Sequence, residues 1–129
     1  MQKSSKIALI APSIFDGVIL HSHCALLIDG KRVDAITPLN KIPQEYMPHH
    51  FSGMLSPGFI DLQVNGGGGL LFNDAPTLTG LKTILNAHYQ QGTHALLPTL
   101  ITADDKTIEA GLKSVGEAVA KGIERIAGI

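Results

Sequence analysis

The sequence has one cysteine, almost no net charge and no apolar run as long as a bilayer span. The single cysteine, Cys24, excludes an internal disulfide, fits a reducing cytoplasm and is expected to be a small core residue. Ten Lys and Arg residues nearly balance eleven Asp and Glu residues, so no basic surface predicts nucleic-acid binding. No signal-peptide pattern follows the apolar run that ends at Pro12. We therefore expect a cytoplasmic protein with neither a nucleic-acid nor a membrane partner.

Residues 1–54 predict the strands of a small β domain and a connector. Residues 6–11 are apolar and predict a first strand. The turn Asp29-Gly30-Lys31 lies between two apolar runs and predicts a hairpin, because glycine tolerates the positive φ of such a turn. Residues 38–50 contain three prolines and predict an irregular connector. The expected arrangement is one of small antiparallel strands followed by an extended segment.

Residues 55–74 predict a strand that ends in polar side chains. Residues 59–64 form a short, mostly apolar run that suits a strand buried on both faces. Gln63 and Asn65 are two positions apart, so in a strand their side chains point to the same side, and Asp61 lies on that side but deeper. A buried carboxylate needs partners, and we interpret Asp61 as structural or as a support of a site.

A run of four glycines, residues 66–69, follows this strand. Glycine allows another group to approach the backbone closely, or allows a loop to move. The run lacks the third glycine of a dinucleotide-binding motif and the Gly-Lys-Ser/Thr of a P-loop. We expect a flexible loop whose backbone N–H groups can offer hydrogen bonds to an anionic group.

Residues 76–129 alternate between helical and strand patterns. A helix is predicted from about residue 78 to residue 89, capped by Asn73, Asp74 or Thr77, and a strand over residues 94–100. A second helix is predicted over residues 102–121, capped by Thr102 or Asp104, and a third apolar run follows it. The residues of the second helix that we expect to be buried are Ile108, Leu112, Val115 and Val119.

The order strand, helix, strand, helix, strand implies parallel strands with helical crossovers. We interpret residues 55–129 as the first two to three β/α units of an incomplete (β/α)₈ barrel of the TIM type, because a complete barrel needs eight units. The chain is then expected to be the N-terminal piece of a longer protein. The alternative is a complete small three-layer domain.

Two motifs suggest a family. They are Ser-Pro-Gly-Phe-Ile-Asp-Leu-Gln-Val-Asn-Gly over residues 56–66 and Leu-Pro-Thr-Leu-Ile-Thr over residues 97–102. Both resemble the amidohydrolase superfamily and, more narrowly, the N-acetylglucosamine-6-phosphate deacetylase family. The resemblance implies a small β-sandwich domain before an α/β barrel. It also implies metal-dependent hydrolysis of the N-acetyl group of an amino-sugar phosphate by a full-length, homo-oligomeric enzyme.

The resemblance also bears on the site. Most amidohydrolases place two metal-binding histidines where this sequence has Gln63 and Asn65, and neutral amides are poor zinc ligands. The resemblance thus places Gln63, Asn65, Gly66 and Asp61 near the substrate or metal, with no catalytic residue and no metal ligand in this chain. A divalent metal such as zinc is expected in the full-length enzyme but not in this chain alone, which is expected to be inactive.

The histidines are interpreted as structural or solvated. His21 and His23 form a His-x-His pair that we assign to a solvated loop or a sheet edge, His49 and His50 are expected to be exposed, and His88 and His94 to be structural. Two other functions stay open: an amidohydrolase of another cyclic or N-acyl amide, and a non-catalytic α/β binding module.

Overall fold

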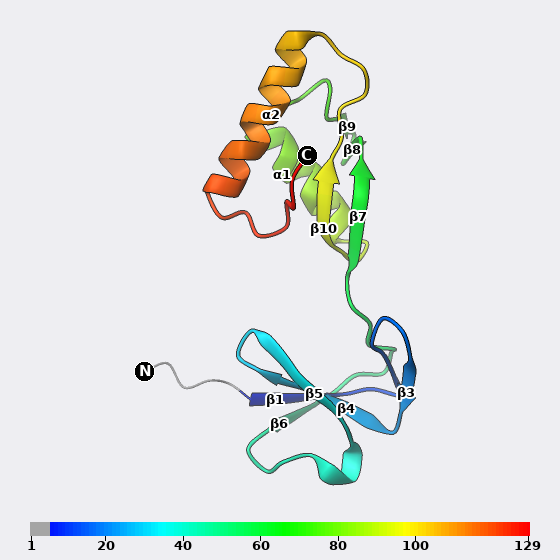
Figure 1. The fold of residues 1–129 in the computed structure, drawn as a ribbon. Coiled ribbons are helices and arrows are strands. Elements are labelled where there is room, and N and C mark those ends of the chain that lie inside the picture. Colours follow the sequence, from blue (N-terminus) through cyan, green and yellow to red (C-terminus); the bar gives the residue numbers. More distant parts are fainter. Residues whose placement is uncertain (1–5) are drawn as a thin grey trace. The chain divides into compact units, whose positions relative to one another are not determined.

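The computed structural model describes residues 6–129, which divide between Pro57 and Gly58 into two compact units (Figure 1). The first unit is made of strands and one short 3₁₀ helix, and the second combines short sheets with two α-helices. Within residues 6–129, neither helix is long and apolar enough to cross a membrane. Each unit has its own core, so each is described separately.

The first unit is built on a four-stranded sheet in the order β5-β4-β1-β6. Its strands are β1 (Lys6–Ile10), β4 (Cys24–Asp29), β5 (Arg32–Pro38) and β6 (Met47–His50). The predicted hairpin is confirmed: β4 and β5 are antiparallel, and Gly30 takes the positive φ of 61° that the turn requires. The core of the sheet consists of Ala8, Ala25, Leu27 and Tyr46.

The prediction of an irregular connector over residues 38–50 was wrong in part. A short 3₁₀ helix, η1 (Leu39–Lys41), is followed by β6, which pairs in parallel with β1. Pro48 lies in β6 and has no N–H, but β6 is an edge strand and can tolerate a missing donor. The sheet is therefore mixed rather than purely antiparallel. A second hairpin pairs β2 (Ser13–Phe15) with β3 (Leu20–Ser22).

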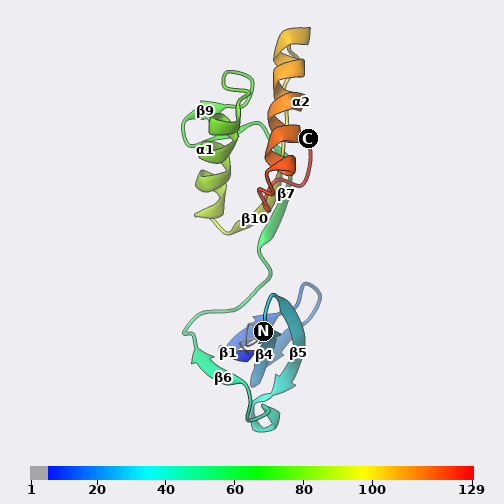
Figure 2. The same cartoon turned by 90° about the vertical axis from the view of Figure 1, so that its left-hand side faces the viewer.

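The second unit contains two parallel strands, β7 (Phe59–Val64) and β10 (Thr93–Pro98), and two helices, α1 (Leu78–Tyr89) and α2 (Asp105–Ala120). Both views show α1 and α2 side by side next to the strands (Figure 1, Figure 2). The N-caps match two of the predicted candidates, since Thr77 Oγ1 accepts from Gly80 N at 3.1 Å and Asp104 Oδ1 accepts from Thr107 N at 2.8 Å. The third apolar run reaches the same sheet through a parallel bridge between Leu96 and Ile126.

The core of the second unit brings both strands and both helices together. Its buried members include Phe72, which precedes α1, and residues from each element: Val64, Leu81, Ile84, Leu96, Val115 and Ala118. The short hairpin of β8 (Gly66–Gly67) and β9 (Leu70–Leu71) packs beside α1.

Two burial predictions were wrong. β7 is not buried on both faces: Phe59, Ile60 and Leu62 remain 68%, 64% and 73% exposed, because β10 is the only strand paired with β7 among residues 6–129. The buried face of α2 consists of Gly111, Ser114, Val115 and Ala118, so only Val115 of the residues predicted to be buried there is buried. Small residues face inward because α2 lies close to its neighbours: a Cβ at Gly111 would be 2.7 Å from Leu100 Cδ1.

Candidate functional site

The candidate site lies where β7 and β10 end. The two strands are parallel, so their carboxyl ends lie at the same edge of the sheet. Just past these ends, Thr99 N donates a hydrogen bond to Val64 O at 2.8 Å and continues the pairing. Asp61 and Gln63 lie along β7, and Asn65 follows it directly. The polar residues singled out from the sequence therefore approach one edge of one sheet.

Asn65 connects the two strand ends. Its side-chain Nδ2 donates to Thr99 O at 3.3 Å, and the residue is half-buried. Asp61 is also half-buried, and its Oδ1 accepts from Gln63 N at 3.2 Å, whereas Gln63 is exposed. The Asn65 amide thus has a bracing contact, and the Gln63 side chain is open to a ligand.

The glycine run is a hairpin rather than an open loop. β8 and β9 pair, and Phe72 N donates to Asn65 O at 2.7 Å at the base of the hairpin. A Cβ at Gly66 would lie 2.2 Å from Leu70 O, so this position has no space for any side chain. Of the two roles considered for these glycines, close approach of the backbone is the one that the structure shows at Gly66.

His88 and Asn73 hold this hairpin region in place. His88 Nε2 lies 2.9 Å from Gly66 O, which confirms that His88 is a hydrogen-bonded structural histidine. Asn73 was considered only as a helix cap, but its side chain pairs with the backbone of Ile101. No local pattern predicts this contact, because its partner is 28 positions away in the sequence. The sequence pointed to this region only through the motif over residues 97–102, which contains Ile101.

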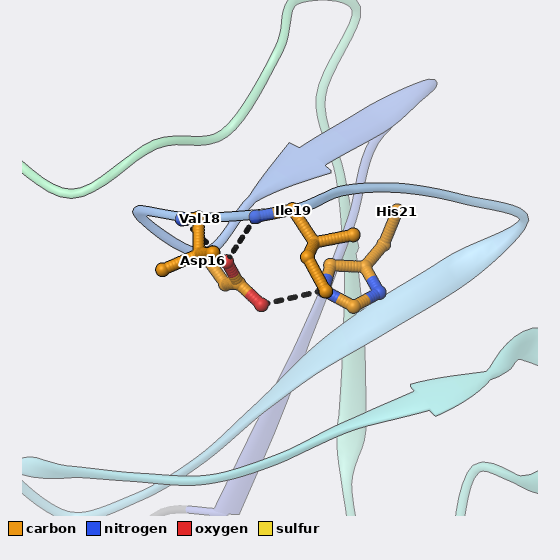
Figure 3. Close-up of polar contacts among 4 residues, drawn as sticks. All are labelled: Asp16, Val18, Ile19 and His21. Carbon is orange, nitrogen blue, oxygen red and sulfur yellow. Dashed lines mark hydrogen bonds and ion pairs between the residues drawn. The ribbon is translucent and has the colours of Figure 1, made fainter.

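The His-x-His pair lies in the first unit. His21 is in β3, and its Nε2 lies 2.7 Å from Asp16 Oδ2 (Figure 3). Asp16 Oδ1 accepts from Val18 N and Ile19 N, so one carboxylate closes the whole β2–β3 turn. The hydrogen bond from His21, followed by those from the backbone N–H groups, lowers the pKa of Asp16 to about 2. His23 is exposed and has a φ of 56°.

The other histidines and the cysteine are placed as follows. His49 and His50 are exposed as predicted, although they lie in β6 rather than in an irregular segment. His94 is exposed in β10. Cys24 is a free, half-buried thiol in β4.

The described residues do not fit a metal site. Within residues 6–129, no group of three or more His, Cys, Asp or Glu side chains is placed to hold an ion. At the strand edge the side chains are the amides of Gln63 and Asn65, with one carboxylate at Asp61, and amides are weak ligands for zinc. The edge therefore supplies hydrogen-bonding groups rather than a ligand set.

The known proteins to which this chain is similar include sugar-phosphate deacetylases. No family model matches the chain. The chain is 42% identical over 113 residues to N-acetylgalactosamine-6-phosphate deacetylase of Shewanella sp. (strain ANA-3), which covers 85% of this chain and 29% of the relative. It is 32% identical over 117 residues to N-acetylglucosamine-6-phosphate deacetylase of Haemophilus influenzae, which covers 90% of this chain and 31% of the relative. The chain thus spans about three-tenths of the length of these relatives.

Solved structures that resemble this chain also include sugar-phosphate deacetylases. N-acetylglucosamine-6-phosphate deacetylase from Pasteurella multocida matches 93% of this chain and 32% of its own, with a TM-score of 0.83 and 28% identity. A variant of the Mycobacterium smegmatis enzyme, in complex with N-acetyl-D-glucosamine-6-phosphate, matches 92% of this chain and 31% of its own, with a TM-score of 0.79 and 25% identity. This chain is therefore homologous to the N-terminal part of the N-acetylglucosamine-6-phosphate and N-acetylgalactosamine-6-phosphate deacetylases, which belong to the amidohydrolase superfamily.

Proposed function

We propose that this chain is the N-terminal part of a deacetylase that acts on an N-acetylated amino-sugar 6-phosphate. In this reaction, water adds to the acetyl carbon, the amide C–N bond breaks, and the sugar nitrogen takes a proton to leave as an amine beside acetate. The observation that carries the proposal is the 42% identity over 113 residues to a deacetylase of this class. The TM-score of 0.83 to a second deacetylase supports it.

The two β/α units fit the start of an eight-unit barrel. In such barrels the chemistry lies at the carboxyl ends of the strands, the edge at which Asn65 and Thr99 meet. We propose that Gln63, Asn65, Gly66 and Asp61 form one wall of the substrate site. The exposed amide of Gln63 would hydrogen-bond to the substrate or to a water molecule, and Asn65 would hold the wall to β10.

The divalent metal expected for this family would be held by residues outside this chain. This follows from the amide side chains at the strand edge, which are not a ligand set for zinc. Location in the cytoplasm and assembly of the full-length enzyme into a homo-oligomer remain part of the proposal.

The substrate is proposed to be either the gluco or the galacto sugar phosphate, which differ in the configuration of the C4 hydroxyl. The expectation from the motifs is N-acetylglucosamine 6-phosphate, while the 42% relative carries the name of the galactosamine enzyme. Both sugars present the same acetamide and phosphate, so the residues that read C4 decide between them.

A chimera tests the proposal. This chain would replace the matching N-terminal 29% of the Shewanella enzyme, and acetate release would be measured with each sugar phosphate. We expect release from at least one of the two sugars. The ratio of the two kcat/KM values in the chimera, compared with the same ratio in the parent enzyme, reports whether this part of the enzyme affects C4 selectivity. A folded chimera with the metal content of the parent enzyme and no acetate release from either sugar would show the proposal to be wrong.

Substitutions in the chimera test the proposed wall. Gln63→Ala and Asn65→Ala are each expected to lower kcat/KM by about tenfold, the size of one lost hydrogen bond. The matched control is Gln91→Ala, since Gln91 is exposed in the turn after α1. Equal activity of Gln63→Ala and Gln91→Ala would remove Gln63 from the wall.

A further inference from the structure

The imidazole of His88 lies against the glycine hairpin that follows β7. Its Nε2 is 2.9 Å from Gly66 O, and the residue is half-buried on α1. A Cβ at Gly67 would lie 2.9 Å from His88 Cδ2 and Nε2, so the ring rests directly on the backbone of Gly67. A larger residue at position 67 would push the ring away. The hairpin and the ring are therefore fitted to each other.

The direction of the hydrogen bond is set by chemistry. A carbonyl oxygen can only accept, so His88 Nε2 must carry the proton and donate it to Gly66 O. In neutral imidazole this selects the tautomer with the proton on Nε2. A cationic ring would donate in the same way. The contact is thus available to the ring in both charge states.

The carbonyl that His88 holds belongs to the residue next to Asn65. The same short stretch is fixed from two further directions: Phe72 N donates to Asn65 O at 2.7 Å, and Asn65 Nδ2 donates to Thr99 O at 3.3 Å. Loss of the His88 contact would leave the peptide after Asn65 held from fewer sides. A shift of that peptide would move the Asn65 amide, which lies at the edge assigned to the substrate.

We infer that His88 is a positioning residue: its Nε2–H holds the Gly66 carbonyl and thereby fixes Asn65 at the carboxyl end of β7. The catalytic consequence rests on the proposed function, whereas the hydrogen bond itself does not. His88 lies on a helix next to the strand edge and acts through the backbone of the hairpin rather than by contact with the reacting atoms. In the full-length enzyme it would keep one wall of the site preorganised.

The first test measures the hydrogen bond in the chain itself. Two-dimensional ¹H–¹⁵N spectra at alkaline pH, where imidazoles are neutral, should show the His88 proton on Nε2. In His88→Leu the Phe72 amide should exchange with solvent about tenfold faster relative to the buried Leu96 amide. His94→Leu, which changes an exposed histidine of the same unit, should leave this ratio unchanged. A proton on Nδ1, or an unchanged ratio in His88→Leu, would overturn the inference.

The second test measures catalysis in the chimera. His88→Leu should lower kcat about tenfold with a smaller change in KM, because the reacting geometry rather than the binding of the sugar is disturbed. His88→Gln, which places an amide N–H near the former Nε2, should recover most of the loss, and His94→Leu should match the parent. A His88→Gln variant as slow as His88→Leu would contradict a positioning role. If the unmodified chimera releases no acetate, the proposed function fails and the catalytic consequence fails with it, while the spectra still judge the hydrogen bond.

Discussion

Asn73 pairs with the backbone of Ile101 through both ends of its side-chain amide. Nδ2 donates to Ile101 O and Oδ1 accepts from Ile101 N, each at 2.9 Å. The side chain thereby makes the pair of hydrogen bonds that a backbone residue makes in a β-sheet, and it joins two loops that do not pair through their own backbones. One loop follows the glycine hairpin, and the other follows β10. The pair therefore ties together the two segments that leave the candidate site.

Asn73→Ala should destabilise the second unit by roughly 1–2 kcal/mol, because two hydrogen bonds are lost at a partly solvated position. Asn86→Ala is the matched control, since Asn86 is exposed on α1 of the same unit, and it should change stability by less than about 0.5 kcal/mol. Denaturant unfolding followed by circular dichroism measures both variants. Equal midpoints for the two variants would show that the Asn73 pairing adds nothing to stability.

Two helical glycines should respond in opposite ways to alanine. A Cβ at Gly80 of α1 would lie 2.2 Å from the carbonyl oxygen of Ala75, so Gly80→Ala should destabilise the unit by about 1–3 kcal/mol. A Cβ at Gly116 of α2 would have no atom within 4 Å, so Gly116→Ala should stabilise it by about 0.5–1 kcal/mol through helix propensity. Thermal unfolding of both variants provides the comparison. A destabilised Gly116→Ala variant would contradict the open surroundings of that position.

The Asp16–His21 contact should make stability depend on acidic pH. The pKa of Asp16 is lowered from 3.8 to about 2 in the folded chain, chiefly by the hydrogen bond from His21. A lowered pKa means that the folded state favours the carboxylate, so the contribution is complete above pH 3.8 and is lost as the pH falls through about 2. Asp16→Asn should remove this part of the pH dependence. Midpoints of thermal unfolding across this range measure the difference, and parallel curves for the parent and the variant would refute the prediction.

The Tyr46 hydroxyl should ionise at a higher pH than an ordinary tyrosine. Its hydroxyl donates to Asp34 Oδ2 at 2.5 Å, and this hydrogen bond raises the pKa of Tyr46 to about 12. The folded state favours the neutral phenol, so the stabilising contribution is complete below about pH 10 and is lost as the pH rises toward 12. Ultraviolet titration of tyrosinate in the parent minus Tyr46→Phe isolates this group. A midpoint near 10 in that difference would contradict the contact with Asp34.

Local chemistry was sufficient to predict several elements. The Asp29-Gly30-Lys31 turn selects a hairpin through the backbone freedom of glycine, and Thr77 and Asp104 begin helices because their oxygens accept early backbone N–H groups. The strand at Phe59–Val64 was placed with its correct bounds, and the polar residues along it were recognised from a period of two. These features depend on neighbours a few positions away. The sequence by itself therefore determines them.

Other features depend on which distant segments meet. β6 became a strand because an open edge of β1 was available, although the three prolines of residues 38–50 predict an irregular segment. The inward face of α2 was selected by close packing at Gly111 rather than by the largest apolar side chains. Asn73 pairs with Ile101 and His88 with Gly66 across 28 and 22 positions, and the latter contact accompanies a glycine run ordered as a hairpin. Only the tertiary structure decides such contacts, because each needs two segments whose proximity no local preference specifies.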